Sequence, residues 1–311
     1  MFALNRLHMR GGPWPRQVRI RSTFLVGTPS TQPPIGRIAA PRGLNLQIYL
    51  LALFEAQSRK RAGAAGACPL PISGGINPWT DLVVSEAKQN TQAKAPITST
   101  QNRARQIKSA IKRLSDENLV LRNVGDPKRP YPLMLLHESA ESQLETLEYV
   151  IPETRKAPFV LTLPVQFFTN GWIYLLTDAE IRMYLVLKHL SATFSEAHLF
   201  SGVYCSDRDR NQRYWISRDI YEAHLTLSRF GLIEVAPNRM RHRDGKLMGF
   251  KSFVESGSML PPHRFFVLGD SPFFESPLGK IRRALLNYPP SYSQMTRGHT
   301  PRNAPAGSLD G

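Results

Sequence analysis

The sequence predicts an α+β protein built from two modules, each with helices followed by a β-hairpin. Two observations favour this class. In residues 41–138, apolar residues first recur at helical spacing and then form short runs separated by turn residues. The same order recurs in residues 159–270. Acidic residues and prolines accumulate between these two parts, in residues 139–158. A chain of 311 residues has room for two such domains and flexible ends.

Residues 1–40 are expected to form a disordered basic arm. The first acidic residue of the chain is Glu55, and the part before it carries seven arginines among scattered Pro and Gly: Arg6, Arg10, Arg16, Arg19, Arg21, Arg37 and Arg42. Transit peptides are also Arg-rich and poor in acids. The prolines and the lack of an amphipathic helix favour a loose arm, or a mis-assigned start codon, over a transit peptide.

The first module, residues 41–138, is expected to contain three helices and a hairpin. Apolar residues recur at helical spacing from Leu44 to Arg61, and a shorter helical segment covers Thr80 to Lys88. Thr98 or Ser99 can cap a third helix that runs to about Ser115. The apolar runs at 119–122 and 131–138 then flank a basic tip with Lys128 and Arg129.

Residues 139–158 are expected to connect the modules. Five glutamates lie in or beside this segment: Glu138, Glu141, Glu145, Glu148 and Glu153. A connecting helix over Ser139–Val150 and a solvated acidic linker both fit this composition.

The second module, residues 159–270, repeats the order of helices and hairpin. Phe159 to Leu163 is a strand candidate, residues 164–172 form a short helix or loop, and Thr177 with Glu180 has the spacing of a capping box. The next helix runs from Ser217 to about Arg229, and no clear helix precedes it after Leu190. Asp244-Gly245 between "LIEVA" and "LMGFKSFVE" predicts a hairpin, and residues 263–270 can add a strand. Residues 271–311 are expected to hold a short helix and a disordered tail.

A winged helix has this order of elements, with helices followed by a hairpin that has a basic tip. The run "SRFGLIEV" at 228–235 resembles the passage from recognition helix to wing in winged-helix regulators. The resemblance covers residues 159–255 well and 44–138 less well. Two successive modules look like the tandem winged-helix initiators of plasmid replication, and a single module looks like bacterial transcription regulators. The resemblance implies binding of double-stranded DNA, as a regulator or an initiator.

The charge balance also favours a polyanionic partner. The chain has a net charge of +16 and a pI near 10.2, which suits nucleic acid or an anionic membrane surface. No apolar run is long enough for a spanning helix, so we expect no membrane. The two cysteines, Cys68 and Cys205, have no metal-ligand spacing and are typical of a reducing compartment, which indicates a cytoplasmic protein.

The helix expected over residues 99–115 carries the best candidates for DNA contact. At 100° per residue, one face holds Gln101, Arg105, Lys108 and Lys112, and the other holds Ala104, Ile107, Ile111 and Leu114. We expect Arg105 and Lys108 to reach base edges, and Arg103, Lys112 and Arg113 to contact phosphates.

In the second module the expected contacts lie mainly in the wing. Arg218 lies outside the apolar stripe of its helix, whereas His224 lies within it and is expected to be a core histidine. The wing carries Arg239, Arg241, Arg243 and Lys246 around one acid, an arrangement suited to following a phosphate backbone.

No catalytic role is expected. The chain has no phosphate-binding loop, no zinc-protease motif and no nucleophile elbow, so neither a cofactor nor a metal is predicted. Asp207 and Asp209 stand among arginines and are expected to be internally paired. A second reading stays open, in which the modules bind an acidic protein partner. Whether the chain forms a homodimer is also left open.

Overall fold

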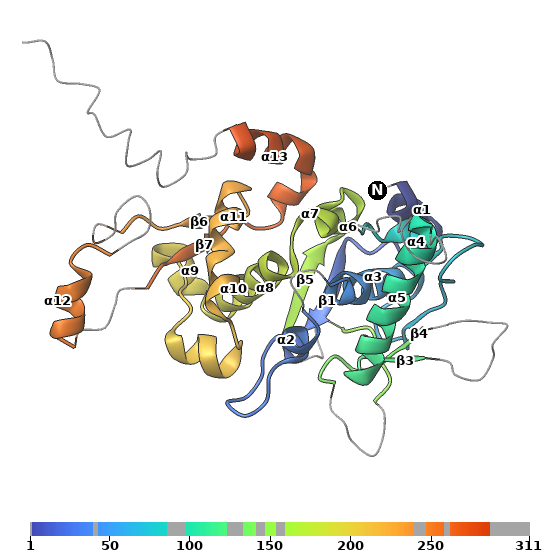
Figure 1. Ribbon diagram of the computed structural model, residues 1–311, viewed down its shortest axis with the longest axis horizontal. Helices are drawn as coiled ribbons and strands as arrows, with labels where there is room; N and C mark the ends of the chain where they lie inside the picture. Colours follow the sequence, from blue (N-terminus) through green and yellow to red (C-terminus); the bar gives the residue numbers. More distant parts are fainter. Residues whose placement is uncertain are drawn as a thin grey trace, which may run out of the picture.

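The computed structural model describes residues 2–39, 43–85, 98–122, 133–140, 147–153, 159–238, 240, 247–257 and 262–286 (Figure 1). The protein is a mixed α+β structure, as predicted. The first half contains α1 (Phe2–Arg10), β1 (Gln17–Arg21), the 3-10 turn η1 (Ser22–Phe24), α2 (Pro34–Ile38), α3 (Asn45–Arg59), β2 (Ala67–Cys68), α4 (Trp79–Leu82), α5 (Ser99–Asp116), β3 (Val120–Arg122) and β4 (Leu133–Leu135).

The second half has more helices, most of them short. It contains β5 (Val160–Pro164), α6 (Val165–Thr169), α7 (Trp172–Leu175), α8 (Asp178–Thr193), α9 (Ser195–Ser201), the π-helical turn η2 (Asp209–Arg213), α10 (Arg218–Glu222), α11 (His224–Arg229), β6 (Ile233–Val235), α12 (Phe250–Glu255), β7 (Phe265–Val267), η3 (Ser271–Phe274) and α13 (Pro277–Leu286). In the described part of the chain, no helix is long and apolar enough to cross a membrane.

Helices α3 and α8 form the centre of the core. Each is buried over most of its circumference, and the buried apolar residues around them make a continuous cluster from Leu4 in α1 to Phe273 in η3. Phe54 of α3 stacks on Phe168 of α6, with ring centroids 4.7 Å apart, and such a pair adds to the free energy gained by burying both rings. The residues of both expected modules therefore pack into a common core.

The prediction of a loose arm is wrong for residues 2–39. Strand β1 pairs antiparallel with β5, from Gln17 opposite Pro164 to Arg21 opposite Val160 (Figure 1). Val18 and Ile20 of this strand are fully buried, because alternation with arginine places both on one face. The many arginines of the segment made it look like a basic arm, so the alternation of apolar and polar residues that is typical of a strand was not recognised in the sequence.

A buried ion pair fixes the end of β1. Glu138 is fully buried, accepts a hydrogen bond from the backbone N–H of Arg21 at 3.0 Å, and pairs with the Arg21 guanidinium. The same guanidinium also donates to the carbonyl of Val150. Arg21 thus joins the supposed arm to the segment that was expected to be a linker.

The described part of that segment is a turn at Ser139 and an extended stretch over residues 147–153. Val150 bridges Ala65, and Glu148 bridges Leu136, so residues 147–153 contain no connecting helix. Residues 141–146 and 154–158 lie outside the described residues.

Both halves place their strands in the same order. In the first, β2 lies between α3 and α4 in sequence and pairs with β4, giving the sheet order β2-β4-β3. In the second, β6 pairs with β7, and Val203 forms a bridge with Phe265 on the other side of β7. In each half, a short segment that follows the long buried helix (β2 after α3, Val203 after α8) pairs with the last strand of that half. This parallels the repeated order of elements that the sequence predicts.

Two details of the second half differ from expectation. The strand expected over 247–255 is instead α12, because β7 is the hydrogen-bonded partner of β6 and fills the core with fully buried Phe265. The helix expected over 217–229 is split at Ala223 into α10 and α11. The ring of His224 lies 2.6 Å from the carbonyl oxygen of Tyr221, and such a side-chain contact competes with the backbone bond that would continue the helix. His224 is buried, as predicted.

Candidate nucleic-acid interface

Helix α5 begins at a capping box. The Thr98 hydroxyl accepts from the Gln101 N–H at 3.2 Å, and the Gln101 side-chain oxygen accepts from the Thr98 N–H at 3.0 Å. This arrangement satisfies two backbone donors that the first turn leaves open. It confirms Thr98 as the cap, and it uses the acceptor of Gln101, which was expected on the DNA-facing side.

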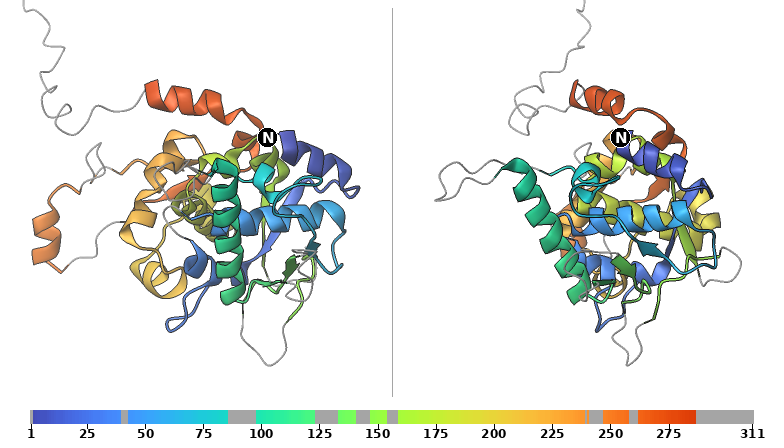
Figure 2. Two further views of the ribbon diagram at one scale, coloured as in Figure 1. Left: turned by 45° about the vertical axis from the view of Figure 1, so that its right-hand side comes forward. Right: turned by 90° about the vertical axis from the view of Figure 1, so that its right-hand side faces the viewer.

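One face of α5 holds the helix against the protein. Ile107, Ala110, Ile111 and Leu114 are buried, and Ala104 is partly buried. Contacts run to α3, α4 and β3. The apolar face that the sequence predicts is therefore confirmed, and the opposite face is directed outward (Figure 2).

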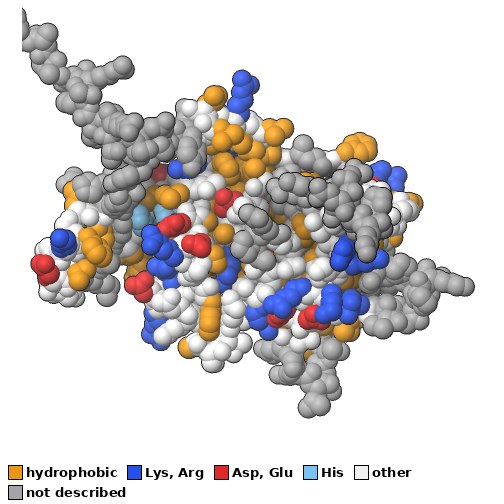
Figure 3. Space-filling view, in the orientation of Figure 1, with side chains coloured by type: hydrophobic (Ala, Val, Ile, Leu, Met, Phe, Trp, Pro, Cys, Tyr) orange, Lys and Arg blue, Asp and Glu red, His pale blue; other side chains and the backbone are white. Residues whose placement is uncertain are grey.

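Two cations on the outward face have no partner among the residues that the structure describes. Arg105 and Lys108 are exposed, and within the described part of the chain neither makes a hydrogen bond or an ion pair. Basic side chains gather over the region of α5 in the space-filling view (Figure 3). A guanidinium and an ammonium held on a fixed helix, one turn apart, are available to an anionic partner.

The C-terminal turn of α5 is more nearly neutral. Lys112 pairs with Asp116, and Arg113 pairs with Glu117, both at 2.8 Å. The hydrogen bond from Lys112 lowers the pKa of the Asp116 carboxyl. These two acids reduce the net charge that Lys112 and Arg113 present.

Arg103 has a structural contact. Its guanidinium donates to the carbonyl of Thr80 in α4 at 3.2 Å, and the residue is partly buried. Arg103 therefore links α5 to α4, and its expected contact with phosphate stays a prediction.

The sequence interpretation missed Arg37. This residue of α2 lies 3.4 Å from the Glu117 carboxylate, and its carbonyl accepts from Arg113 at 3.0 Å. Helix α2 thereby adds a cation beside the end of α5. Pro33 and Pro34 at its start are the sequence signal for a helix N-terminus within the supposed arm.

Most second-module candidates are not described. Arg218 of α10 is exposed but pairs with Glu222 at 2.8 Å. The wing residues Arg239, Arg241, Arg243 and Lys246 lie outside the described residues, as do Lys128 and Arg129 of the first hairpin tip. Asp207 pairs with Arg210 at 3.4 Å, as expected, whereas the contact of Asp209 is a hydrogen bond from the Ser206 hydroxyl.

Among the described side chains, no group of three or more His, Cys, Asp and Glu residues is close enough to hold a metal ion. Comparison of the chain with protein-family models, curated proteins and solved structures finds no match. The outward face of α5, with Arg105 and Lys108 at its middle, is therefore the surface on which a function can be argued.

Proposed function

We propose that the protein binds double-stranded DNA through the outward face of α5. The observation that carries this proposal is the pair of exposed cations, Arg105 and Lys108, on a helix whose other face is anchored in the core. A B-DNA major groove about 12 Å wide admits one α-helix. From Arg105 to Lys112 the helix rises about 10 Å, so three basic side chains lie within one groove crossing.

The surrounding elements support a winged-helix arrangement. Helices α3, α4 and α5 are followed directly by β3 and β4, and β2 completes the sheet in the order β2-β4-β3. In that arrangement α5 is the recognition helix and the hairpin is the wing. The second half would supply a second module, with α10 and α11 before β6 and β7. Its wing cations, Arg239 to Lys246, would follow the phosphate backbone.

The biological role that fits is promoter regulation or the marking of a replication origin. A regulator with one palindromic operator and an initiator with repeated sites give different footprints. Footprinting on the DNA that neighbours the gene would distinguish these two roles.

Salt-dependent fluorescence anisotropy with an arbitrary duplex tests the proposal. Backbone binding by several cations loses affinity steeply between about 50 and 200 mM salt. Lys108→Ala and Arg105→Ala should each weaken binding, whereas Arg282→Ala should not. Arg282 is an exposed arginine on α13, outside both proposed modules.

Sequence preference separates the roles of the two modules. Arg105→Ala should relax the preference for one base at a cost of about 1–3 kcal/mol. Arg241→Ala should weaken all sequences alike and reduce the salt slope by about one. Salt-independent binding, or equal losses from Arg105→Ala and Arg282→Ala, would refute the proposal.

A further inference from the structure

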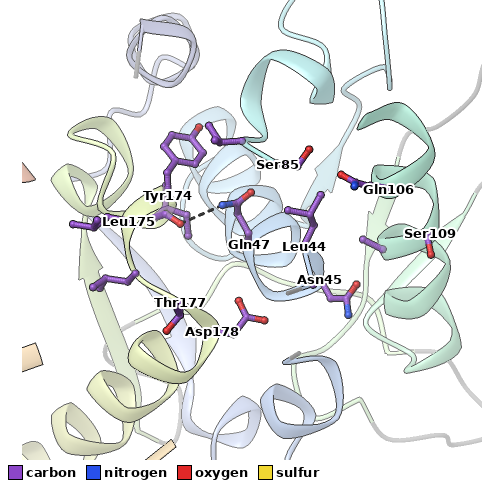
Figure 4. Close-up of a pocket in the computed structure, with 15 residues that line it drawn as sticks. Leu44, Asn45, Gln47, Ser85, Gln106, Ser109, Tyr174, Leu175, Thr177 and Asp178 are labelled. Carbon is purple, nitrogen blue, oxygen red and sulfur yellow. Dashed lines mark hydrogen bonds between the residues drawn. The ribbon is translucent and has the colours of Figure 1, made fainter. Parts of the chain in front are cut away.

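A cleft of about 740 Å³ opens beside α5. Its floor is the start of α3, with Leu44, Asn45 and Gln47. One wall is α5, with Gln106 and Ser109, and the other is α7 and the first residues of α8 (Figure 4). The volume falls in the range of roughly 300–1,000 Å³ that is usual for small-molecule sites.

Among the residues that the structure describes, three buried oxygen atoms around this cleft lack a hydrogen-bond partner: Gln47 Oε1, Gln106 Oε1 and Ser85 Oγ. The residues come from three different parts of the chain and all line the cleft. The orientation of Gln47 is set, because its amide nitrogen donates to the Ile173 carbonyl at 3.3 Å (Figure 4). Its oxygen is thus left as an acceptor. Unsatisfied buried acceptors are costly, and several around one cavity indicate a bound donor.

The charge of the residues that line the cleft limits which hydrogen-bond donors can bind there. Among the described residues that line the cleft there is no lysine or arginine, and Asp178 contributes the one carboxylate. The remaining surface includes the apolar residues Leu44, Ile173 and Leu176. An anion would find no counter-charge among these described residues. A neutral or cationic molecule could donate to the two glutamine oxygens and pack its apolar part on these side chains.

We propose that the cleft between α5 and α7 binds a small molecule that carries an amide or amidine group on an apolar body. Its N–H groups donate to Gln47 Oε1 and Gln106 Oε1, two of the three unpaired oxygens of the described lining residues. The site is distinct from the outward face of α5, because Gln106 and Ser109 face the cleft whereas Arg105 and Lys108 do not line it.

Three probes of the same size test this chemistry. Benzamide, benzamidine and benzoate share one ring and differ in hydrogen-bond donors and charge. Each is titrated into the full-length protein without DNA and followed by ligand-observed NMR. Because no DNA is present, the result is independent of the proposed DNA binding. Benzamide and benzamidine should bind with Kd values on the order of millimolar, as expected for fragments of this size. Benzoate should bind at least about tenfold more weakly, because it presents no N–H donor.

Matched variants locate the binding. Gln106→Met keeps the length of the side chain and removes the acceptor, so benzamide affinity should fall about tenfold. Ser109→Phe places a ring at the exposed rim of the cleft and should also reduce binding. Gln166→Met, on α6 outside the cleft, should leave affinity unchanged, and circular dichroism checks that all three variants fold.

Equal affinity for benzoate and benzamide would overturn the proposal. So would equal affinity of Gln106→Met and Gln166→Met for benzamide. Failure of all three probes to bind would assign the unpaired oxygens to ordered water and would also overturn it.

Discussion

Replacing Glu138 with leucine should strongly destabilise the protein. The carboxylate is fully buried and receives both the backbone N–H and the guanidinium of Arg21, which is itself only 9% exposed. Glu138→Leu leaves that cation buried with the Val150 carbonyl and the face of the Tyr149 ring as its contacts. Breaking a buried pair from one side costs about 3–5 kcal/mol.

Urea unfolding followed by tryptophan fluorescence measures this loss. With an m-value of about 3 kcal/mol/M, a loss of about 4 kcal/mol lowers the midpoint by about 1.3 M. The double variant Arg21→Met/Glu138→Leu should recover most of the stability, because it removes the unpaired charge as well. Glu148→Leu, at an exposed acid of the extended segment 147–153, should change the free energy of unfolding by less than about 0.5 kcal/mol. A shift for Glu138→Leu no larger than that of Glu148→Leu would refute the reasoning.

Three further changes test the helices by the same unfolding assay. Thr98→Ala removes the cap of α5 and should cost about 1 kcal/mol; an unchanged midpoint would contradict the capping box. Ile111→Ala creates a cavity under α5 and should cost about 2–4 kcal/mol, more than any loss from Lys108→Ala on the exposed face. Burial, with a smaller effect of Arg213, lowers the pKa of His189 to about 4, whereas the unfolded chain titrates near 6.5. The unfolded state therefore binds more protons between these values, and the folded state loses stability as pH falls from 7 to 4. The free energy of unfolding of the wild-type protein should therefore fall by roughly 2 kcal/mol more over this range than that of His189→Gln. If the two proteins show the same dependence of this free energy on pH, the prediction is wrong.

The sequence predicted the long helices well. A cap at Thr98 or Ser99 and the capping-box spacing at Thr177 predicted the starts of α5 and α8, and the 3.6-residue period predicted the buried face of α5. These signals come from residues close together in sequence, and the helices that they predict are present in the structure. The pairing of β1 with β5 has no local signal, because the two strands are remote in sequence and the first is interrupted by arginines.

The candidate site was predicted only in part, for a related reason. The face of α5 follows from periodicity, but which cations stay unpaired depends on neighbours. Asp116 and Glu117 engage Lys112 and Arg113, and α2 brings Arg37 to the same end of the helix. Arg103 is directed instead to Thr80. Such pairings are set by tertiary packing, so a count of positive charges along the helix overstates the charge available to DNA.

The pairing of β1 with β5 also determines when the chain can finish folding on the ribosome. Arg21 and Val160 are opposite each other, and 139 residues separate them in sequence (160 minus 21). At about 5–20 residues per second, translation needs roughly 7–28 s to supply the second strand after the first. During that interval Val18 and Ile20 have no partner strand, and the arginines between and beside them act as gatekeepers against aggregation of the nascent chain.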